Sequence, residues 1–538
     1  MRTAVRRALY VKGFEDWAPA AASVGVLVCL LVSRPVGLFA DEGGVLTFHG
    51  DVARTGWNPI ERTLTPAAVP MLRKLWTVQV DGDIYAQPLV APGLAMFGRV
   101  RSAVYVMTEQ DRIYAFDAAD GGRLWGPVAL GTPVPRAALS CGTIDPVGIT
   151  STPVVDREAG TLYVAGLTTP DGGRTKVYMI TALDVKSGTR RPGWPVEIAP
   201  PAVAGRRFAA AVQRQGGALT LVGGVIYVPF GGYQGDCGDY HGWVVGVPTA
   251  APKRQEAFAT PSGRMGGIPA AGGLAADLRG NLYAATGHSD PGGRTDFGNS
   301  LLRLQPSPLR FSGAPRDYFT PSNVAVLNAA DTDLGSTAPL VLPDLPGWAT
   351  PRLLFIAGTQ GIAYLVNRDD MGGLSRGTGI TREGVYSRCV FGTCDAGGLE
   401  VASATAYWDG GTAGRLIFVP GHGRQPAPCG GTGGIAALRL TLLPRTRAVT
   451  LTVAWCSPSM RDPGAPAVSS DGAAGGVVWV VDREAGALYA LDARTGAALH
   501  VLRGADALPN AHQPITPSIW GGRVYVGAGR ELAAYGLQ

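Results

Sequence analysis

Charged residues are scarce in this 538-residue sequence. Asp, Glu, Lys and Arg together make up 16% of it, against about 25% in an average chain. The net charge is +6, but only five of the 47 basic residues are lysines, and no Lys/Arg run is interleaved with aromatic residues. A nucleic-acid-binding groove is therefore not expected.

Several chemical signatures are also missing. The sequence has no H-E-x-x-H, no P-loop, no C-x-x-C zinc pair and no C-x-x-C-H haem-attachment site. It also has no strict Gly-X-Y period, which excludes collagen. Zinc proteases, P-loop enzymes and c-type haem proteins are therefore not indicated.

Glycine and proline, by contrast, are abundant. The 77 Gly and 41 Pro amount to 22% of the chain, against about 12% on average. This content would break a long helical bundle. Hydrophobic residues still make up 46% and are enough to bury a core. The composition therefore predicts an all-β protein of many short strands and turns.

The N-terminus has the pattern of an export signal. Arg2, Arg6, Arg7 and Lys12 precede an apolar run over residues 18–32, which is shorter than the about 20 residues of a spanning helix. Residues 1–44 are predicted to be a signal peptide or an uncleaved signal anchor. Residues 45–538 are then expected to be periplasmic or extracellular and monomeric, with membrane contact only through the N-terminal segment.

Cysteine usage agrees with export. Apart from Cys29, the chain has an even number of cysteines, which suggests disulfides in an exported protein. Six cysteines allow 15 pairings. We favour Cys389–Cys394 and Cys429–Cys456, which leaves Cys141–Cys237 by elimination.

A short apolar strand with a central aromatic residue recurs eight times, with a mean spacing of 60 residues. The aromatic positions are Tyr105, Tyr163, Tyr227, Tyr283, Phe355, Phe418, Trp479 and Tyr525. This spacing predicts an eight-bladed β-propeller of four-stranded antiparallel blades. The last blade lacks an outer strand, so Leu75–Val80 is expected to pair near Tyr535 and close the ring.

A second pattern follows several of these strands. Ala115–Trp125, Ala182–Trp194 and Ala490–His500 share an Asp, a Gly turn and a terminal position that is Trp in the first two. The Asp is expected to cap its own turn, and the Trp to pack between neighbouring blades. A VDREAG stretch occurs twice, ending at Gly160 and Gly486. It is interpreted as a hairpin turn that joins different strand pairs in its two blades.

The A-x-D-x-x-[TDS]-G-x-x-x-W pattern resembles the repeat of pyrroloquinoline-quinone (PQQ) propellers. The segment His49–Trp76 is similar to the opening segment of the quinoprotein alcohol dehydrogenases. YHGWVVG near His241, DYFTPSNVAVLNAADTDLGS near Asp317 and YLVNRDDMGG near Asn367 resemble motifs of an exported bacterial group of PQQ-like propellers without an assigned reaction. The resemblance covers roughly residues 45–538. It also extends to non-catalytic scaffolds, including an outer-membrane assembly lipoprotein.

The resemblance implies PQQ and calcium as cofactors for an enzyme of this kind. In the quinoprotein enzymes, PQQ lies under a ring formed by two adjacent disulfide-linked cysteines, and calcium is held by Glu, Asn and Asp beside a catalytic Asp. No two cysteines are adjacent here, and none of the other residues can be placed at a matching position. No cofactor is therefore firmly predicted, and the catalytic and metal-binding residues stay unassigned.

In a propeller, the connections after the second and fourth strand of each blade lie on one face, here called the upper face. All six cysteines fall in these connections. The loops after the second strand carry the candidate ligand-binding residues, which are Asp236, Asp239, His241, His288, Asp290, Arg294, Asp296, His422 and Arg424. Asp236, Asp239, Asp290 and Asp296 could supply calcium ligands. No calcium-loop motif is present, however, and solvated loop side chains are the favoured interpretation.

The sequence thus predicts an exported PQQ-like β-propeller that acts as a non-catalytic binding or scaffold module at the cell envelope. Its partner would be an envelope protein or a small polar ligand. The alternative is a PQQ-dependent oxidoreductase, of the alcohol or sugar dehydrogenase type, with an atypical pocket.

Overall fold

The computed structural model describes residues 43–290, 296–376, 384–511 and 515–538. The predicted export segment lies almost entirely outside these residues, and so does Arg294. Among the described residues, no helix combines the length and the apolar character needed to cross a membrane.

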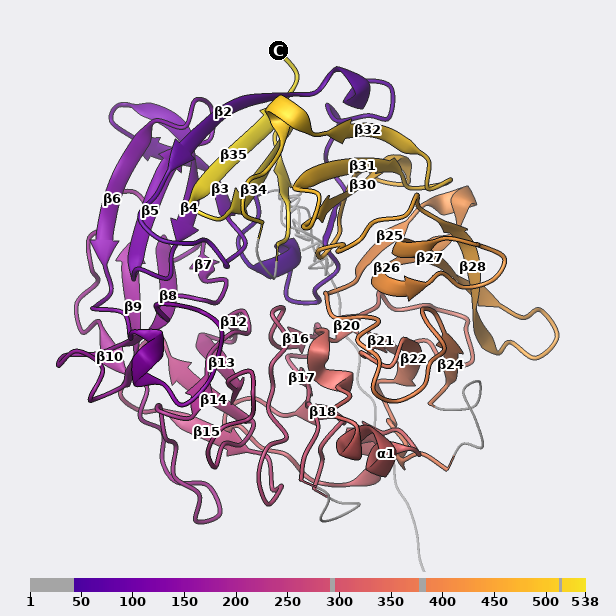
Figure 1. The fold of residues 1–538 in the computed structure, drawn as a ribbon, viewed down its shortest axis with the longest axis horizontal. Coiled ribbons are helices and arrows are strands. Elements are labelled where there is room, and N and C mark those ends of the chain that lie inside the picture. Colours follow the sequence, from indigo (N-terminus) through magenta and orange to yellow (C-terminus); the bar gives the residue numbers. More distant parts are fainter. Residues whose placement is uncertain (1–42, 291–295, 377–383, 512–514) are drawn as a thin grey trace, which may run out of the picture. The chain divides into compact units, whose positions relative to one another are not determined.

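Eight β-sheets follow one another around a ring, in chain order (Figure 1). Blade 1 consists of β3 (Leu89–Met96), β4 (Arg99–Met107), β5 (Arg112–Asp117) and β6 (Arg123–Ala129), and blade 2 of β7 (Val154–Asp156), β8 (Thr161–Thr168), β9 (Val177–Asp184) and β10 (Val196–Glu197). Blade 3 consists of β12 (Thr220–Val222), β13 (Val225–Gly232), β14 (Trp243–Pro248) and β15 (Glu256–Ala259). Blade 4 consists of β16 (Ala275–Ala276), β17 (Leu282–Ala285), β18 (Leu301–Leu304) and β19 (Tyr318–Thr320).

Blades 5 to 8 repeat this order. Blade 5 consists of β20 (Leu340–Val341), β21 (Leu353–Ala357), β22 (Ile362–Asn367) and β24 (Tyr386–Cys389), and blade 6 of β25 (Ala406–Asp409), β26 (Arg415–Arg424), β27 (Thr432–Leu442) and β28 (Val449–Cys456). Blade 7 consists of β29 (Ala467–Asp471), β30 (Ala474–Asp482), β31 (Ala487–Asp492) and β32 (Ala498–Leu502). Blade 8 consists of β33 (Ser518–Trp520), β34 (Arg523–Ala528), β35 (Glu531–Gly536) and β2 (Arg73–Gln79).

Three short strands and several helical turns lie outside this pattern. The extra strands are β1 (Trp57–Asn58), β11 (Gln213–Arg214) and β23 (Gly373–Leu374), and the α-helix is α1 (Val324–Ala329). The 3-10 turns are η1 (Phe48–Gly50), η2 (Val69–Met71), η3 (Arg136–Ala138), η4 (Pro315–Asp317), η5 (Leu334–Ser336), η6 (Gly411–Ala413) and η7 (Gly504–Asp506).

The sequence predictions of eight blades and of ring closure are confirmed. Each of the eight aromatic positions lies in the second strand of its blade. Strand β2 pairs antiparallel with β35, with Lys74 opposite Tyr535 and Trp76 opposite Ala534. The N-terminal strand therefore supplies the fourth strand of the last blade, as the missing outer strand indicated.

Neighbouring blades meet through the aromatic residues of the repeat. In blade 1, Trp125 Nε1 and the Tyr105 hydroxyl both donate to the carbonyl of Val185 in blade 2, at 3.0 and 2.8 Å. A Cβ on Gly188 would lie 2.7 Å from the Trp125 ring, so only glycine leaves room for it. Asp184 caps the same turn through the backbone N–H of Lys186, at 3.0 Å. The repeat motif thus encodes the joint between blades.

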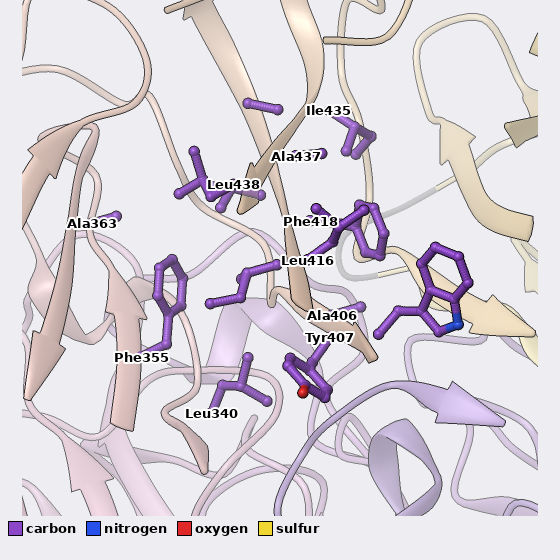
Figure 2. Packing of buried hydrophobic residues seen from close by; sticks show 14 of the residues in the cluster. Leu340, Phe355, Ala363, Ala406, Tyr407, Leu416, Phe418, Ile435, Ala437 and Leu438 are labelled. Carbon is purple, nitrogen blue, oxygen red and sulfur yellow. The ribbon is translucent and has the colours of Figure 1, made fainter. Parts of the chain in front are cut away.

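Hydrophobic clusters continue this packing through the ring. In Figure 2, Phe355 of blade 5 lies in one buried cluster with Leu416 and Phe418 of blade 6. These side chains are fully buried, and Trp408 and Trp479 are among the largest buried ones in the chain. Apolar contacts between adjacent sheets therefore hold each blade against the next.

The segment over residues 45–58 runs inside the ring and contacts every blade (Figure 1, indigo). Its backbone or side-chain bonds reach the innermost strand of each blade, or the residue just before it, at Val90, Val155, Leu219, Ala276, Val341, Tyr407, Val468 and Ile519 in turn. Arg54, 1% exposed, donates to the carbonyls of Phe48 and Leu274. We call residues 45–58 the inner belt.

Candidate functional site

A cavity of about 560 Å³ opens on the upper face. Its walls come from the second-strand loops of blades 3 and 4 and from six connections between blades. The main polar residues around it are Tyr85, Thr143, Arg214, Tyr233, Gln234, Asp236, Tyr240, His288, Asp331 and Asp333. We call this space the upper cavity.

His288 stands at the centre of the polar wall of the upper cavity. Its Nδ1 lies 2.9 Å from Asp333 Oδ1 and 3.0 Å from Asp331 Oδ1, and its Nε2 lies 3.5 Å from Asp236 Oδ2. Burial alone lowers the pKa of His288, but hydrogen bonds to Asp236 and Asp333 and their charges outweigh it and raise the pKa to about 10. At neutral pH the ring is therefore an imidazolium among three carboxylates.

The backbone helps to place this group. The His288 N–H donates to Asp333 Oδ1 at 2.7 Å. A Cβ on Gly287 would lie 2.9 Å from the same oxygen, so the glycine lets the carboxylate approach the turn. Asp236 and Asp331 both have positive φ, 52° and 50°, which points to a geometry set by the surrounding loops.

Asp236 is tied to further polar residues. The Tyr240 hydroxyl donates to Asp236 Oδ1 at 2.5 Å. Arg264 donates to the Asp236 carbonyl at 3.2 Å and forms a two-pronged ion pair with Asp290 at 3.0 and 3.3 Å. Asp290 therefore lies next to the His288 cluster but belongs to an ion pair of its own.

The other predicted residues of these two loops are not part of the cluster. His241 Nε2 lies 3.7 Å from Asp239 Oδ1, and burial, reinforced by the charge of Arg206, lowers the pKa of His241. Asp296 accepts from the Ser289 hydroxyl at 2.6 Å and from the Gly298 N–H at 3.0 Å. Each of these contacts stabilises the conformation of its own loop.

His422 and Arg424 were expected in a loop, but they lie in strand. The antiparallel pairing of β26 with β27 continues through Gly421 opposite Gly434 and, after an irregularity, Arg424 opposite Thr432. Glycine-rich sequence does not end a strand when its partner keeps the register. From this strand, the His422 side chain contacts a polar group that is separate from the one around His288.

The second polar group centres on Asp462. His422 Nε2 lies 2.8 Å from Asp462 Oδ1, and Arg483 forms an ion pair with the same carboxylate. Burial alone raises the pKa of Asp462, but the hydrogen bond with His422 and the charge of Arg483 outweigh it and lower the pKa. Arg483 belongs to the second VDREAG turn, which joins β30 to β31, whereas the first joins β7 to β8.

The cysteines pair in the arrangement favoured from the sequence. Disulfides join Cys141 to Cys237, Cys389 to Cys394 and Cys429 to Cys456. The first links two loops that line the upper cavity, and the Thr143 hydroxyl donates across the same junction to Gln234 Oε1 at 3.0 Å. This disulfide therefore fastens two walls of the cavity together.

Sequence reasoning missed several residues of the site. Asp331 and Asp333 lie in the connection after the fourth strand of blade 4, inside the ADTDLGS motif. The upper-face rule that placed the cysteines applied to them equally, so this signal was present. Arg214 lies in β11, between blades 2 and 3, and no pattern in the sequence marks it.

The donor set does not fit a calcium site. Asp236, His288 and Asp331 each offer one atom, all within 4.8 Å of one another, and they are the one such group among the described residues. Calcium prefers oxygen ligands, and a protonated His288 offers no lone pair. Of the four aspartates that could have supplied calcium ligands, only Asp236 belongs to this group, and Asp239, Asp290 and Asp296 do not.

The PQQ arrangement implied by the resemblance is not reproduced either. The three disulfides join cysteines separated by 5, 27 and 96 positions, so none forms a ring between neighbours. The upper cavity does contain three tyrosines, Tyr85, Tyr233 and Tyr240, together with converging carboxylates. It is thus a polar, partly aromatic pocket without the holding groups of the quinoprotein enzymes.

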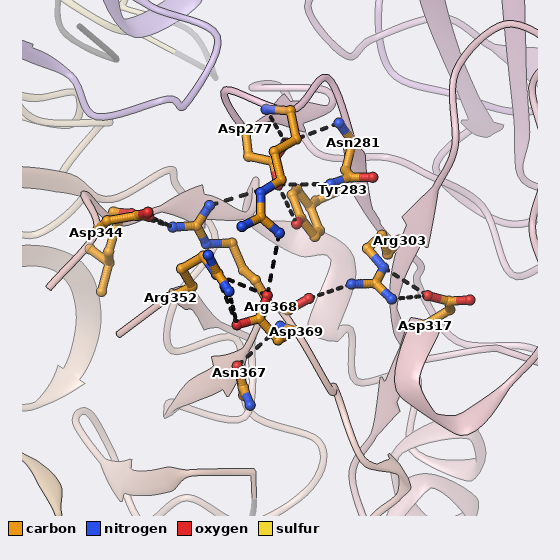
Figure 3. Close-up of polar contacts among 12 residues, drawn as sticks. Asp277, Asn281, Tyr283, Arg303, Asp317, Asp344, Arg352, Asn367, Arg368 and Asp369 are labelled. Atoms are coloured by element: carbon orange, nitrogen blue, oxygen red, sulfur yellow. Dashed lines mark hydrogen bonds and ion pairs between the residues drawn. The ribbon is translucent and has the colours of Figure 1, made fainter. Parts of the chain in front are cut away.

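Two motifs that suggested the family have a structural role on the opposite face. Arg368, from YLVNRDDMGG, is 4% exposed; it bonds the Leu342 carbonyl at 3.1 Å and lies 3.7 Å from the buried Asp277. Figure 3 shows this network, in which Arg303 also joins Asp317 of the DYFTP motif. These charges connect blades 4 and 5 and lie away from the upper cavity.

Comparison with known proteins agrees with this fold. Residues 73–288 match the family model described as outer membrane protein assembly factor BamB. No curated protein sequence matches the chain.

Among solved structures, a quinohemoprotein alcohol dehydrogenase from Pseudomonas putida HK5 superposes with a TM-score of 0.63 at 16% identity, covering 92% of this chain and 80% of that one. The corresponding enzyme from Comamonas testosteroni gives 0.58 at 15% identity, with the same coverage. A europium-containing methanol dehydrogenase gives 0.64 at 14% identity, covering 93% of this chain and 99% of that one. At these identities the likeness concerns the fold, an eight-bladed β-propeller, and the family match covers residues 73–288 of the chain.

Proposed function

We propose that this protein is an exported, non-catalytic binding propeller that takes a small polar ligand into the upper cavity. The observation that carries the proposal is the cavity itself, about 560 Å³ in volume and lined by loops from most of the ring. Polar side chains that converge on one concavity are typical of a ligand site. The family match to an outer membrane protein assembly factor supports a place at the cell envelope, where a protein is the alternative partner.

The Cys141–Cys237 disulfide supports binding at this site. It joins the loop that carries Thr143 to the loop that carries Asp236, and both line the cavity. A wall fixed before the ligand arrives loses less conformational entropy on binding. Three disulfides also suit an oxidising compartment, so we extend the proposal to residues 1–44 as a signal peptide or anchor.

A thermal-shift screen tests the proposal. The purified protein is heated with single sugars, sugar acids and amino acids at millimolar concentration. A ligand at 100 times its Kd should raise the Tm by about 2–3 °C for a chain of this size. Ala402 lines the cavity and is partly exposed, so Ala402→Trp should fill the space and abolish the shift.

The matched control is Ala119→Trp, at an exposed turn of blade 1 on the opposite face, which should keep the shift. If every compound leaves the Tm unchanged, or if a shift survives in Ala402→Trp, the upper cavity is not the binding site.

The second candidate is a PQQ-dependent oxidoreductase of the alcohol or sugar dehydrogenase type. It is favoured by the tyrosines and carboxylates that line the cavity and by the fold shared with quinohemoprotein alcohol dehydrogenases. PQQ would supply a two-electron acceptor when bound. If desalted protein retains quinone absorbance after incubation with PQQ and Ca²⁺, and then reduces a dye with an alcohol or sugar, this candidate replaces the binding proposal.

A further inference from the structure

Arg214 presents an unpaired charge to the upper cavity. It lies in β11, which pairs with β13, and its guanidinium is folded beside Gly216, where a Cβ would lie 3.3 Å from Cζ. Within the described part of the chain, this guanidinium has no hydrogen-bond or ion-pair partner. A cation without a partner at the wall of a cavity favours an anionic ligand group.

The neighbouring carboxyl does not balance this charge. Glu109 is fully buried behind the wall and accepts from the Gly148 N–H at 2.7 Å. Burial raises the pKa of Glu109 to about 7, against the lowering effects of that bond and of Arg214. Near neutral pH Glu109 is therefore only partly ionised, and Arg214 keeps most of its attraction for an anion.

The His288 wall has the opposite character. Three carboxylates surround one imidazolium, so this wall carries net negative charge at neutral pH. The side chain of Asp331 is 74% exposed, which leaves its carboxylate accessible to a ligand in the cavity. Carboxylates accept hydrogen bonds from hydroxyl and ammonium groups.

We infer that the upper cavity recognises a small organic acid that also carries hydroxyl or ammonium groups. Its carboxylate pairs with Arg214 in the two-pronged geometry that guanidinium favours, and its hydrogen-bond donors face Asp331. This inference rests on the proposed function, because it names the ligand class of the same cavity. Sugar acids and amino acids share this chemistry, and the experiment separates them.

Titration calorimetry with matched probes tests the inference. One arm compares D-glucuronate with D-glucose, and the other compares L-serine with ethanolamine, which lacks the carboxylate. We expect the acid of one arm to bind about 10- to 100-fold more tightly than its partner compound. The arm that shows the difference identifies the source of the ligand.

Substitution then assigns the difference to one side chain. Arg214→Gln should remove the preference for the acid, whereas Arg445→Gln, an exposed arginine outside the cavity lining, should keep it. Asp331→Asn should weaken the binding of an acid and of its partner compound to a similar degree. The Tm of each variant without ligand reports whether it is folded. Within the described residues the Arg214 guanidinium makes no hydrogen bond or ion pair that the substitution would remove.

The outcomes separate this inference from the proposed function. If acid and partner compound bind equally and Ala402→Trp abolishes both, the cavity binds ligands but the inference is wrong. It is also wrong if Arg214→Gln keeps the preference. If no probe binds the wild-type protein, both the inference and the proposed function fail.

Discussion

At the scale of single residues, His288 shows how the upper cavity holds its charge. One imidazolium balances part of the charge of Asp236, Asp331 and Asp333, which come from two separate connections. Such a group keeps three loops together. Its stability depends on the proton of His288, so it responds to pH.

We expect His288 to stay protonated far above the usual range of histidine. Its pKa is raised to about 10, above the about 6.5 of an unfolded chain. The stabilisation it contributes is therefore complete below pH about 6.5 and is lost as the pH rises through about 10. Histidine NMR titration, assigned with His288→Gln, and the Tm as a function of pH measure this. A midpoint near 6.5 in the folded protein would contradict the proposed ion pairs.

The sequence predicted part of this site. Asp236 and His288 follow the second strands of blades 3 and 4, and the register of the aromatic strands placed both on the upper face. Their meeting with Asp331 and Asp333 could not be predicted, because loop composition does not determine which side chains converge. Arg214 is an ordinary arginine in sequence, and only its position at the cavity gives it a role.

At the scale of elements, the repeat motif connects one blade to the next. The Gly of each motif receives the Trp of the preceding blade, as with Trp76 on Gly121, Trp125 on Gly188 and Trp455 on Gly496. His500 occupies the corresponding register in blade 7, opposite Ala490, as Trp125 lies opposite Ala115 in blade 1. The expectation that Trp packs between blades is thus confirmed, and the glycine of the turn has a packing reason.

We expect Gly188→Ala to destabilise the propeller by about 2–4 kcal/mol, because the new Cβ would meet Trp125 at 2.7 Å and the residue has φ of 69°. The matched control is Gly193→Ala in the same blade. Gly193 has φ of 83° but open space around it, so only the backbone cost of about 1–2 kcal/mol applies. Chemical unfolding of both variants measures the difference. Equal losses would show that the Trp–Gly contact is not a tight joint.

At the scale of the whole molecule, the inner belt links blades that are otherwise joined only to their neighbours. The N–H groups of Val155, Ala276, Val341, Tyr407 and Val468 all donate to its carbonyls. Without it, the innermost strands would expose a row of unpaired backbone groups to the channel. The belt was not predicted, because its contacts are pairings of one or two residues without a sequence period. The repeat and the missing outer strand, by contrast, predicted the eightfold ring.

We expect removal of the inner belt to weaken the entire ring. A chain that begins at Glu61 should have a clearly lower Tm than one that begins at Gly43, because the inner strand of each blade loses its partner. It should also bind more of a hydrophobic dye. Differential scanning calorimetry compares the two chains, and an unchanged Tm would show that the belt only fills the channel.

The contacts of the inner belt and of strand β2 also determine the order in which parts of the ring can form during folding. The Asn58 side-chain amide donates to the carbonyl of Ile519, 461 residues further on, and β2 can pair only after β35 has been synthesised. At roughly 5–20 residues per second, Asn58 is made roughly 20 to 90 s before Ile519. The belt can pair with blades 1 and 2 early, but its contacts with blade 8 and the pairing of β2 form only after the final strands have been made, so the ring closes last.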